Sequence, residues 1–131
     1  MSKTKLKRSD LVYPELSYKI IGCAFDVYNL LGYGHHEKYY QRGLVEALSA
    51  QKLIFKQQVY FPLKYRQKII GKIFLDFLIE DKIVIEIKKG ERFSKTNIDQ
   101  VLEYLKLSNL KLAILINFGK NGVIFKRIVN L

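Results

Sequence analysis

The sequence has one cysteine, Cys23, and no tryptophan. A single cysteine excludes an intrachain disulfide and argues against a zinc site built from thiolates. The chain has no run of about 20 apolar residues, which is the length of a membrane-spanning helix. It has no apolar N-terminal run of the kind that signal peptides carry. We therefore expect a cytoplasmic protein.

Acidic residues are scarce. Asp and Glu number 12 against 23 Lys and Arg, so the 131 residues carry a formal net charge of +11 at pH 7. A small domain this basic is expected to bind polyanions, with nucleic acid first and an anionic membrane surface second. The alternatives are a basic protein with no special partner and an interaction protein for an acidic partner.

Linkers, repeats and low-complexity segments are also missing. The composition, 49% hydrophobic and 27% charged, is that of a globular protein, and the length fits one domain. We expect residues 1–10 to be a flexible basic N-terminal arm and residues 11–131 to form the domain.

Hydrophobic periodicity predicts three helices and five strands. The period is 3.6 residues in the helices and two in most of the strands. Helices are expected after Pro14, from His35 or His36 to about Lys52, and from Ser94 or Thr96 to about 108; strands are expected at 59–65, 69–79, 83–88, in "KLAILINF" and in "VIFKRIVN". This order predicts an α/β domain with a mixed sheet.

The segment "FLDFLIEDKIVIEIKKGE" is an apolar hairpin that carries charges inside its strands. Alternation places Glu86 and Lys88 on one face of their strand. A three-residue turn at "EDK" would place Asp76 directly opposite Glu86, whereas a two-residue turn would place the two acids on opposite faces. Because "EDK" has no glycine, the turn length stays open at this stage.

Two apposed carboxylates in an apolar setting repel each other unless a cation joins them. A hard divalent ion, Mg²⁺ or Mn²⁺, prefers such oxygen ligands. Lys88 could then orient or deprotonate a water molecule, or offset charge in a transition state. The alternative is a solvated sheet face on which Lys88 pairs with Glu86.

The spacing of Asp76 and Glu86-Ile87-Lys88 resembles the D…(D/E)-x-K pattern of the PD-(D/E)XK nuclease superfamily. Two further segments fit the same resemblance. "GHHEKYY" is similar to the motif of the GxxExxY protein family, and "QVLEY" is similar to the QxxxY motif of RecB-like nucleases. One position departs from the pattern, because Leu75 stands where the superfamily name has proline.

This resemblance implies a restriction-endonuclease-like core, in which helices flank a central mixed β-sheet. It implies a Mg²⁺ or Mn²⁺ site and roles for residues at matching positions. The implied metal ligands are Glu37, Asp76, Glu86 and the carbonyl of Ile87. The implied catalytic residues are Lys88, Glu86, Asp76, Gln100 and Tyr104. The nucleic-acid-binding residues that we expect are Tyr40, Lys89, Arg92 and Lys95.

Each of the supporting residues has a plainer alternative. Glu37 could simply stabilise a helix N-terminus, and Tyr40 could be a core aromatic. Gln100 and Tyr104 share a helix face and could be a surface amide above a packed ring. The basic segment that follows the third strand could be a solvated loop.

The function expected from the residues and the resemblance together is a Mg²⁺-dependent nuclease. It would hydrolyse phosphodiester bonds of DNA, or of RNA, through an activated water molecule. Cutting both strands of a duplex at once would need two copies, so a homodimer is a candidate assembly. The alternative is a non-catalytic nucleic-acid-binding module with a nuclease-like fold.

Overall fold

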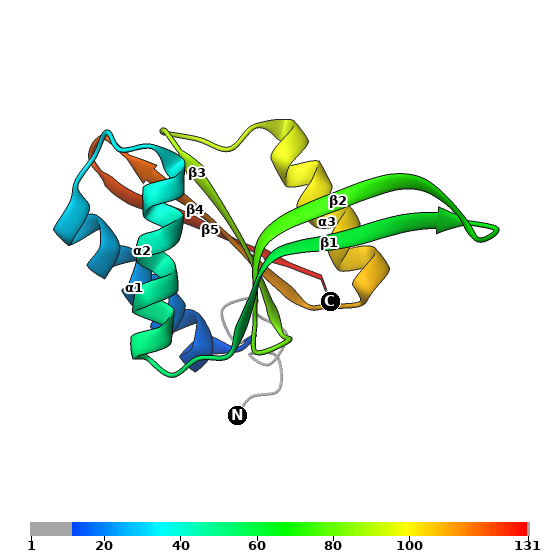
Figure 1. The fold of residues 1–131 in the computed structure, drawn as a ribbon, viewed down its shortest axis with the longest axis horizontal. Helices are drawn as coiled ribbons and strands as arrows, with labels where there is room; N and C mark the ends of the chain where they lie inside the picture. Colours follow the sequence, from blue (N-terminus) through cyan, green and yellow to red (C-terminus); the bar gives the residue numbers. More distant parts are fainter. Residues whose placement is uncertain (1–11, 131) are drawn as a thin grey trace, which may run out of the picture.

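The structure is a computed structural model that describes residues 12–130. The basic arm expected at residues 1–10 lies outside the described residues. The elements follow the predicted order, helix, helix, three strands, helix and two strands (Figure 1). They are α1 (Pro14–Leu31), α2 (Glu37–Ala50), β1 (Phe55–Tyr65), β2 (Lys68–Ile79), β3 (Ile83–Lys89), α3 (Lys95–Ser108), β4 (Leu112–Gly119) and β5 (Gly122–Val129).

The strands form one sheet in the order β1-β2-β3-β4-β5. β3 and β4 run parallel and are connected through α3, while all other neighbours are antiparallel. The prediction of an α/β domain with a mixed sheet is confirmed. Because a parallel pair needs a long crossover, α3 must pass over one face of the sheet.

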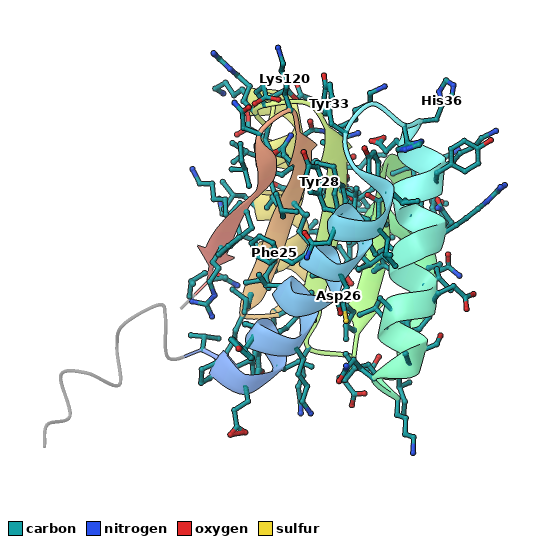
Figure 2. The ribbon with its side chains drawn as sticks, turned by 90° about the vertical axis from the view of Figure 1, so that its left-hand side faces the viewer. Phe25, Asp26, Tyr28, Tyr33, His36 and Lys120 are labelled. Atoms are coloured by element: carbon teal, nitrogen blue, oxygen red, sulfur yellow. The ribbon has the colours of Figure 1, made fainter. Side chains whose placement is uncertain are left out.

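The helices cover both faces of the sheet. α1 and α2 pack side by side on one face (Figure 2), where Ile20, Leu44 and Leu48 meet alternate residues of β3 and β4. α3 covers the other face, where Val101 and Leu105 meet Val84 and Leu115. β3 and β4 are therefore buried on both sides, which explains their nearly continuous apolar sequence.

The helix ends follow from local sequence. Pro14 stands at the start of α1, where its missing N–H costs nothing. Gly32, with a φ of 75°, follows the end of α1. The Ser94 hydroxyl accepts a hydrogen bond from the Asn97 amide at 3.1 Å, so the predicted cap of α3 is confirmed. Cys23 is buried in the core. No helix within residues 12–130 is long and apolar enough to cross a membrane.

β1 begins at Phe55, four residues before the prediction. The polar residues of "FKQQ" hide the strand period from the sequence. Two tertiary contacts hold the segment in the sheet. The Glu80 amide donates to the Ile54 carbonyl at 2.8 Å, and the Phe55 ring packs edge-on against Phe77 with centroids 5.9 Å apart.

β1 and β2 extend beyond the rest of the sheet as a long hairpin (Figure 1). The two strands pair from Phe55 opposite Ile79 to Tyr65 opposite Lys68. β2 pairs with β3 only through its last three residues, 77–79. We call residues 59–74, which lie beyond that pairing, the hairpin arm. Its tip residues Arg66 and Gln67 have φ values of 49° and 68°, as a tight turn of type I′ requires.

Candidate active site

The turn between β2 and β3 has the three residues Glu80, Asp81 and Lys82, with Ile79 paired to Ile83. The three-residue turn of the hypothesis is therefore confirmed. Glu80 and Asp81 both have a φ of 55°. The Glu80 carboxylate accepts a hydrogen bond from the Ile54 amide at 2.7 Å, and this contact braces a turn that has no glycine.

Asp76 and Glu86 meet where β2 separates from β3. The last backbone pair is Phe77 opposite Ile85, one residue before the two acids. Beyond it, each carboxylate bonds to the other strand. The Asp76 amide donates to Glu86 Oε1 at 3.1 Å, and the Ile87 amide donates to Asp76 Oδ2 at 2.7 Å. The two acids that the sequence placed opposite each other are therefore adjacent.

Burial and repulsion raise the pKa of Glu86. Its side chain is only 5% exposed. Desolvation by burial, followed by the charge of Asp76, raises the pKa from 4.5 to about 8, while the nearby Lys88 ammonium lowers it. A carboxyl group with this pKa keeps its proton at neutral pH unless a cation arrives. A perturbed acid beside a second acid is typical of functional sites.

The donor set fits a hard divalent cation. Each of the two carboxyl groups uses one oxygen in its bond to the other strand and has a second oxygen. Oxygen is the ligand that Mg²⁺ and Mn²⁺ prefer. A divalent cation would also remove the repulsion that raises the pKa of Glu86.

Glu37 does not join these two acids. It lies in the first turn of α2, as predicted, but α2 packs on the face of the sheet opposite α3. Within residues 12–130, no group of three or more His, Cys, Asp and Glu side chains lies close enough to hold a metal ion. The structure thus brings two of the three predicted carboxylates together, and a metal-binding role for Glu37 stays a prediction.

Asn117 is a polar residue of the site that the sequence reading missed. It is fully buried on β4 and pairs with Lys88 across the parallel strands. Its amide nitrogen donates to the Arg92 carbonyl at 3.3 Å, while its Oδ1 is buried with no hydrogen-bond partner among the described residues. An acceptor left unpaired beside a lysine suits the positioning of that ammonium group. As the one polar residue inside "LAILINF", it was a visible signal.

The two residues of the QxxxY segment, Gln100 and Tyr104, have different surroundings. The Gln100 side chain reaches β2 and donates to the Phe74 carbonyl at 3.5 Å, two residues before Asp76. Tyr104 is 4% exposed and packs edge-on against Phe61 with centroids 5.1 Å apart. Its pKa is raised by burial first and by the charge of Asp81 second. Asp81 belongs to the turn that closes the β2–β3 hairpin. The burial of Tyr104 and its packing against Phe61 make it a core residue.

Tyr40 also packs in the core. It is fully buried, stacks on Phe118 with centroids 4.4 Å apart, and donates its hydroxyl hydrogen to the Gly32 carbonyl. The side chain has no exposed surface, and a contact with nucleic acid stays a prediction. Tyr40 instead holds the loop after α1 against the sheet.

The predicted basic residues lie between the last residue of β3 and the first residue of α3. Lys89, Arg92 and Lys95 are all exposed, and Lys95 pairs with Asp99 at 3.0 Å. Their loop is fixed at Glu91, whose carboxylate accepts a hydrogen bond from the Lys120 amide at 2.6 Å. Tyr28 of α1 donates to the Gly119 carbonyl at 2.7 Å in the same β4–β5 turn (Figure 2). The loop therefore presents its basic side chains from a braced backbone.

The solved structure of SSO0001 shares this architecture. The chain resembles the crystal structure of SSO0001 with a TM-score of 0.54 and 23% identity, over 72% of this chain and 50% of that one. It thus spans half the length of SSO0001, a likeness that shows the fold alone. An alkaline exonuclease (LHK-Exo) from Laribacter hongkongensis gives a TM-score of 0.38 and 13% identity, over 88% of this chain and 82% of that one.

No curated protein matches the sequence. Membership of the GxxExxY branch stays a prediction. A family model described as the PD-(D/E)XK nuclease superfamily matches residues 14–128, almost the whole described domain. With Asp76, Glu86 and Lys88 at the end of the β2–β3 pairing and helices on both faces of a mixed sheet, the chain belongs to the PD-(D/E)XK nuclease superfamily.

Proposed function

We propose that this protein is a metal-dependent nuclease that hydrolyses phosphodiester bonds, with DNA as the first substrate to test. The observation that carries the proposal is the contact between Asp76 and Glu86, two residues from Lys88 on β3. Three charged side chains are thereby concentrated at one break in an otherwise apolar hairpin. The net charge of +11 supports a polyanionic substrate.

Asp76, Glu86 and the carbonyl of Ile87 would hold Mg²⁺ or Mn²⁺. When bound, such an ion supplies a Lewis acid beside the phosphate and lowers the pKa of water. Glu86 would give up its proton on ion binding, because attraction to the ion would replace the repulsion from Asp76. Glu37 is a further candidate ligand only if α2 or its first turn moves.

Lys88 supplies the positive charge at the phosphate. Its stem is half-buried beside Asn117, so the ammonium group has limited freedom. It can stabilise negative charge that develops on the phosphate oxygens, or take the proton of the attacking water. Lys89 and Arg92 lie next along the chain and bind neighbouring phosphates, and Gln100 fixes the backbone of β2 beside Asp76.

The test is cleavage of single- and double-stranded DNA and RNA in Mg²⁺ or Mn²⁺ by purified protein. We expect cleavage that EDTA abolishes and that Glu86→Ala and Lys88→Ala each remove. Cleavage that survives in both variants would come from a contaminant and would contradict the proposal. Lys19→Ala is the matched control, since it removes an exposed lysine of α1 without touching the acidic pair or the basic residues near it.

One observation favours a second candidate, a nucleic-acid-binding module that does not hydrolyse its ligand. Among residues 12–130 only two of the predicted carboxylates converge, where the family resemblance implies three. Titration of Mn²⁺ into the protein by calorimetry separates the two candidates. Metal uptake that Asp76→Asn abolishes supports the nuclease, whereas nucleic-acid binding without metal uptake supports the module.

A further inference from the structure

The outer side of the hairpin arm carries exposed aromatic rings beside the acidic pair. Tyr60 of β1 and Phe74 of β2 lie directly opposite each other, and their rings are 5.2 Å apart at the centroids. Both are exposed, Tyr60 to 45% and Phe74 to 54%. Phe74 lies two residues before Asp76, which is about 7 Å along a strand. Two half-exposed rings thus stand next to the candidate active site.

The two faces of the arm differ in what they meet. The inner residues Val59, Phe61 and Ile73 pack against α3 and belong to its core. On the outer face, Lys72 lies opposite Pro62 of β1. It shares this face with Phe74, which is two residues further along β2. The inner face therefore anchors the arm, which leaves the rings of the outer face in a fixed position at the surface.

Charge identifies the kind of partner. The arm, residues 59–74, contains Lys64, Arg66, Lys68 and Lys72 and no acidic residue. All four cationic side chains are exposed. A row of cations that runs from an exposed aromatic pair to the tip of the arm is complementary to a polyanion that has flat apolar groups, as nucleic acids do. A protein partner of mixed charge has no such match with the arm.

We propose that the hairpin arm binds single-stranded nucleic acid, with an unpaired base stacked on the Tyr60–Phe74 pair and the backbone along the basic residues. This inference rests on the proposed function and adds the class of substrate. Exposed rings favour an unpaired base, because the faces of bases in a duplex are already covered by their neighbours. Because Phe74 is two residues from Asp76 on β2, the adjoining phosphate would lie about 7 Å along the strand from Asp76.

The absence of tryptophan makes a direct test simple. Phe74→Trp introduces a single tryptophan, whose fluorescence a stacked base quenches. We would titrate the variant in EDTA with short oligothymidylate and with a hairpin duplex, so that no cleavage occurs. We expect quenching by the single strand, with the duplex at least about tenfold weaker, the loss of one stacking contact. Tyr18→Trp, exposed on α1, is the control and should show no quenching.

A loss-of-ring series completes the test. Tyr60→Leu and Phe74→Leu should each weaken single-strand binding about tenfold while the protein keeps its thermal unfolding profile. Equal affinity for duplex and single strand, or no quenching of Phe74→Trp, would overturn the inference. So would self-association by sedimentation that Tyr60→Leu abolishes, because the rings would then join two copies.

Cleavage assays separate this inference from the proposed function. Cleavage in Mg²⁺ without quenching would refute the single-strand surface and leave the nuclease intact. Quenching without cleavage would refute the nuclease and leave the binding surface.

Discussion

The two halves of the β2–β3 hairpin are joined by different kinds of hydrogen bond. Near the turn, Phe77, Leu78 and Ile79 pair with Ile85, Val84 and Ile83 through a regular backbone ladder. Beyond Phe77 the ladder stops, and the carboxylates of Asp76 and Glu86 bond to backbone amides instead. The ladder half stabilises the fold, whereas the carboxylate half keeps charged groups at a position where an apolar pair would be more stable.

The difference shows how a site can be built into a buried strand. β2 bends away at Asp76, where Gln58 of β1 lies between the regular pairs with a φ of 50°. Asp76 is partly exposed to solvent at this point. The site therefore lies where the regular hydrogen bonds between β2 and β3 end.

The largest expected effect comes from removing the charges of the carboxylate half. Lys88→Ala and Glu86→Ala should each lower the rate of cleavage by about 10² to 10³, the usual cost of losing one electrostatic group from an active site. The measurement is kcat with a saturating oligonucleotide. In the ladder half, Val84→Ala removes methyl groups from the same face of β3. It should cost about 1 kcal/mol of stability and leave kcat unchanged. Equal losses of kcat in both halves would contradict the distinction.

The second prediction concerns cation affinity and pH. Since the pKa of Glu86 is about 8, a cation must displace a proton at lower pH. The association constant for Mn²⁺ should therefore rise about tenfold per pH unit up to about pH 8 and then level off. Asp76→Leu, which removes the repelling charge, should lower the pKa of Glu86 when that carboxyl group is titrated in the metal-free protein. A pH-independent affinity would show that Glu86 is already ionised.

The third prediction concerns stability without metal. The folded-state pKa of Glu86 lies above its ordinary 4.5, so the folded protein holds a proton that the unfolded chain releases. This contribution to stability is complete below about pH 4.5 and is lost as the pH rises through about 8. Glu86→Gln has no titrating group at this position. Between about pH 4.5 and pH 8, its free energy of unfolding should therefore rise relative to that of the wild type, by about 1–3 kcal/mol. Urea unfolding of both proteins at several pH values measures the difference, and a constant difference would refute the assignment.

The smallest effect is expected at the bend. Gln58 has a left-handed backbone conformation, which a β-branched residue tolerates poorly. Gln58→Val should destabilise the protein by about 1–2 kcal/mol, and Gln58→Gly should be within about 1 kcal/mol of the wild type. The same pair of substitutions at Gln57, which lies in the regular pairing, should reverse the order, because valine favours a strand.

The fold could be predicted from the sequence because its periods are clear. The order of elements and the mixed sheet follow from local patterns. The apposition of Asp76 and Glu86 follows from alternation only for a three-residue turn, a length that the sequence left open. The early start of β1 could not be predicted, since "FKQQ" is polar and is held by contacts with Glu80 and Phe77. The turn at Glu80 lacks glycine, and its brace comes from Ile54, a residue distant in sequence.

The candidate site could be predicted only in part, for a related reason. A motif gives spacing along the chain but not the layer to which a helix belongs. Glu37 begins a helix on the other face of the sheet, and Tyr40 turns its ring into the core. Asn117 could have been found, because an amide inside a fully buried strand requires a partner.

The short loop between the two acids has a consequence for the order of folding. Asp76 and Glu86 are ten residues apart in the chain and meet as soon as their hairpin closes, an event of about 1–10 μs in isolated hairpins. β4, the parallel partner of β3, follows α3 in the chain, so its pairing with β3 closes a much longer loop. Charge repulsion is thus encountered at the earliest step of assembly, so refolding should slow as alkali ionises both acids.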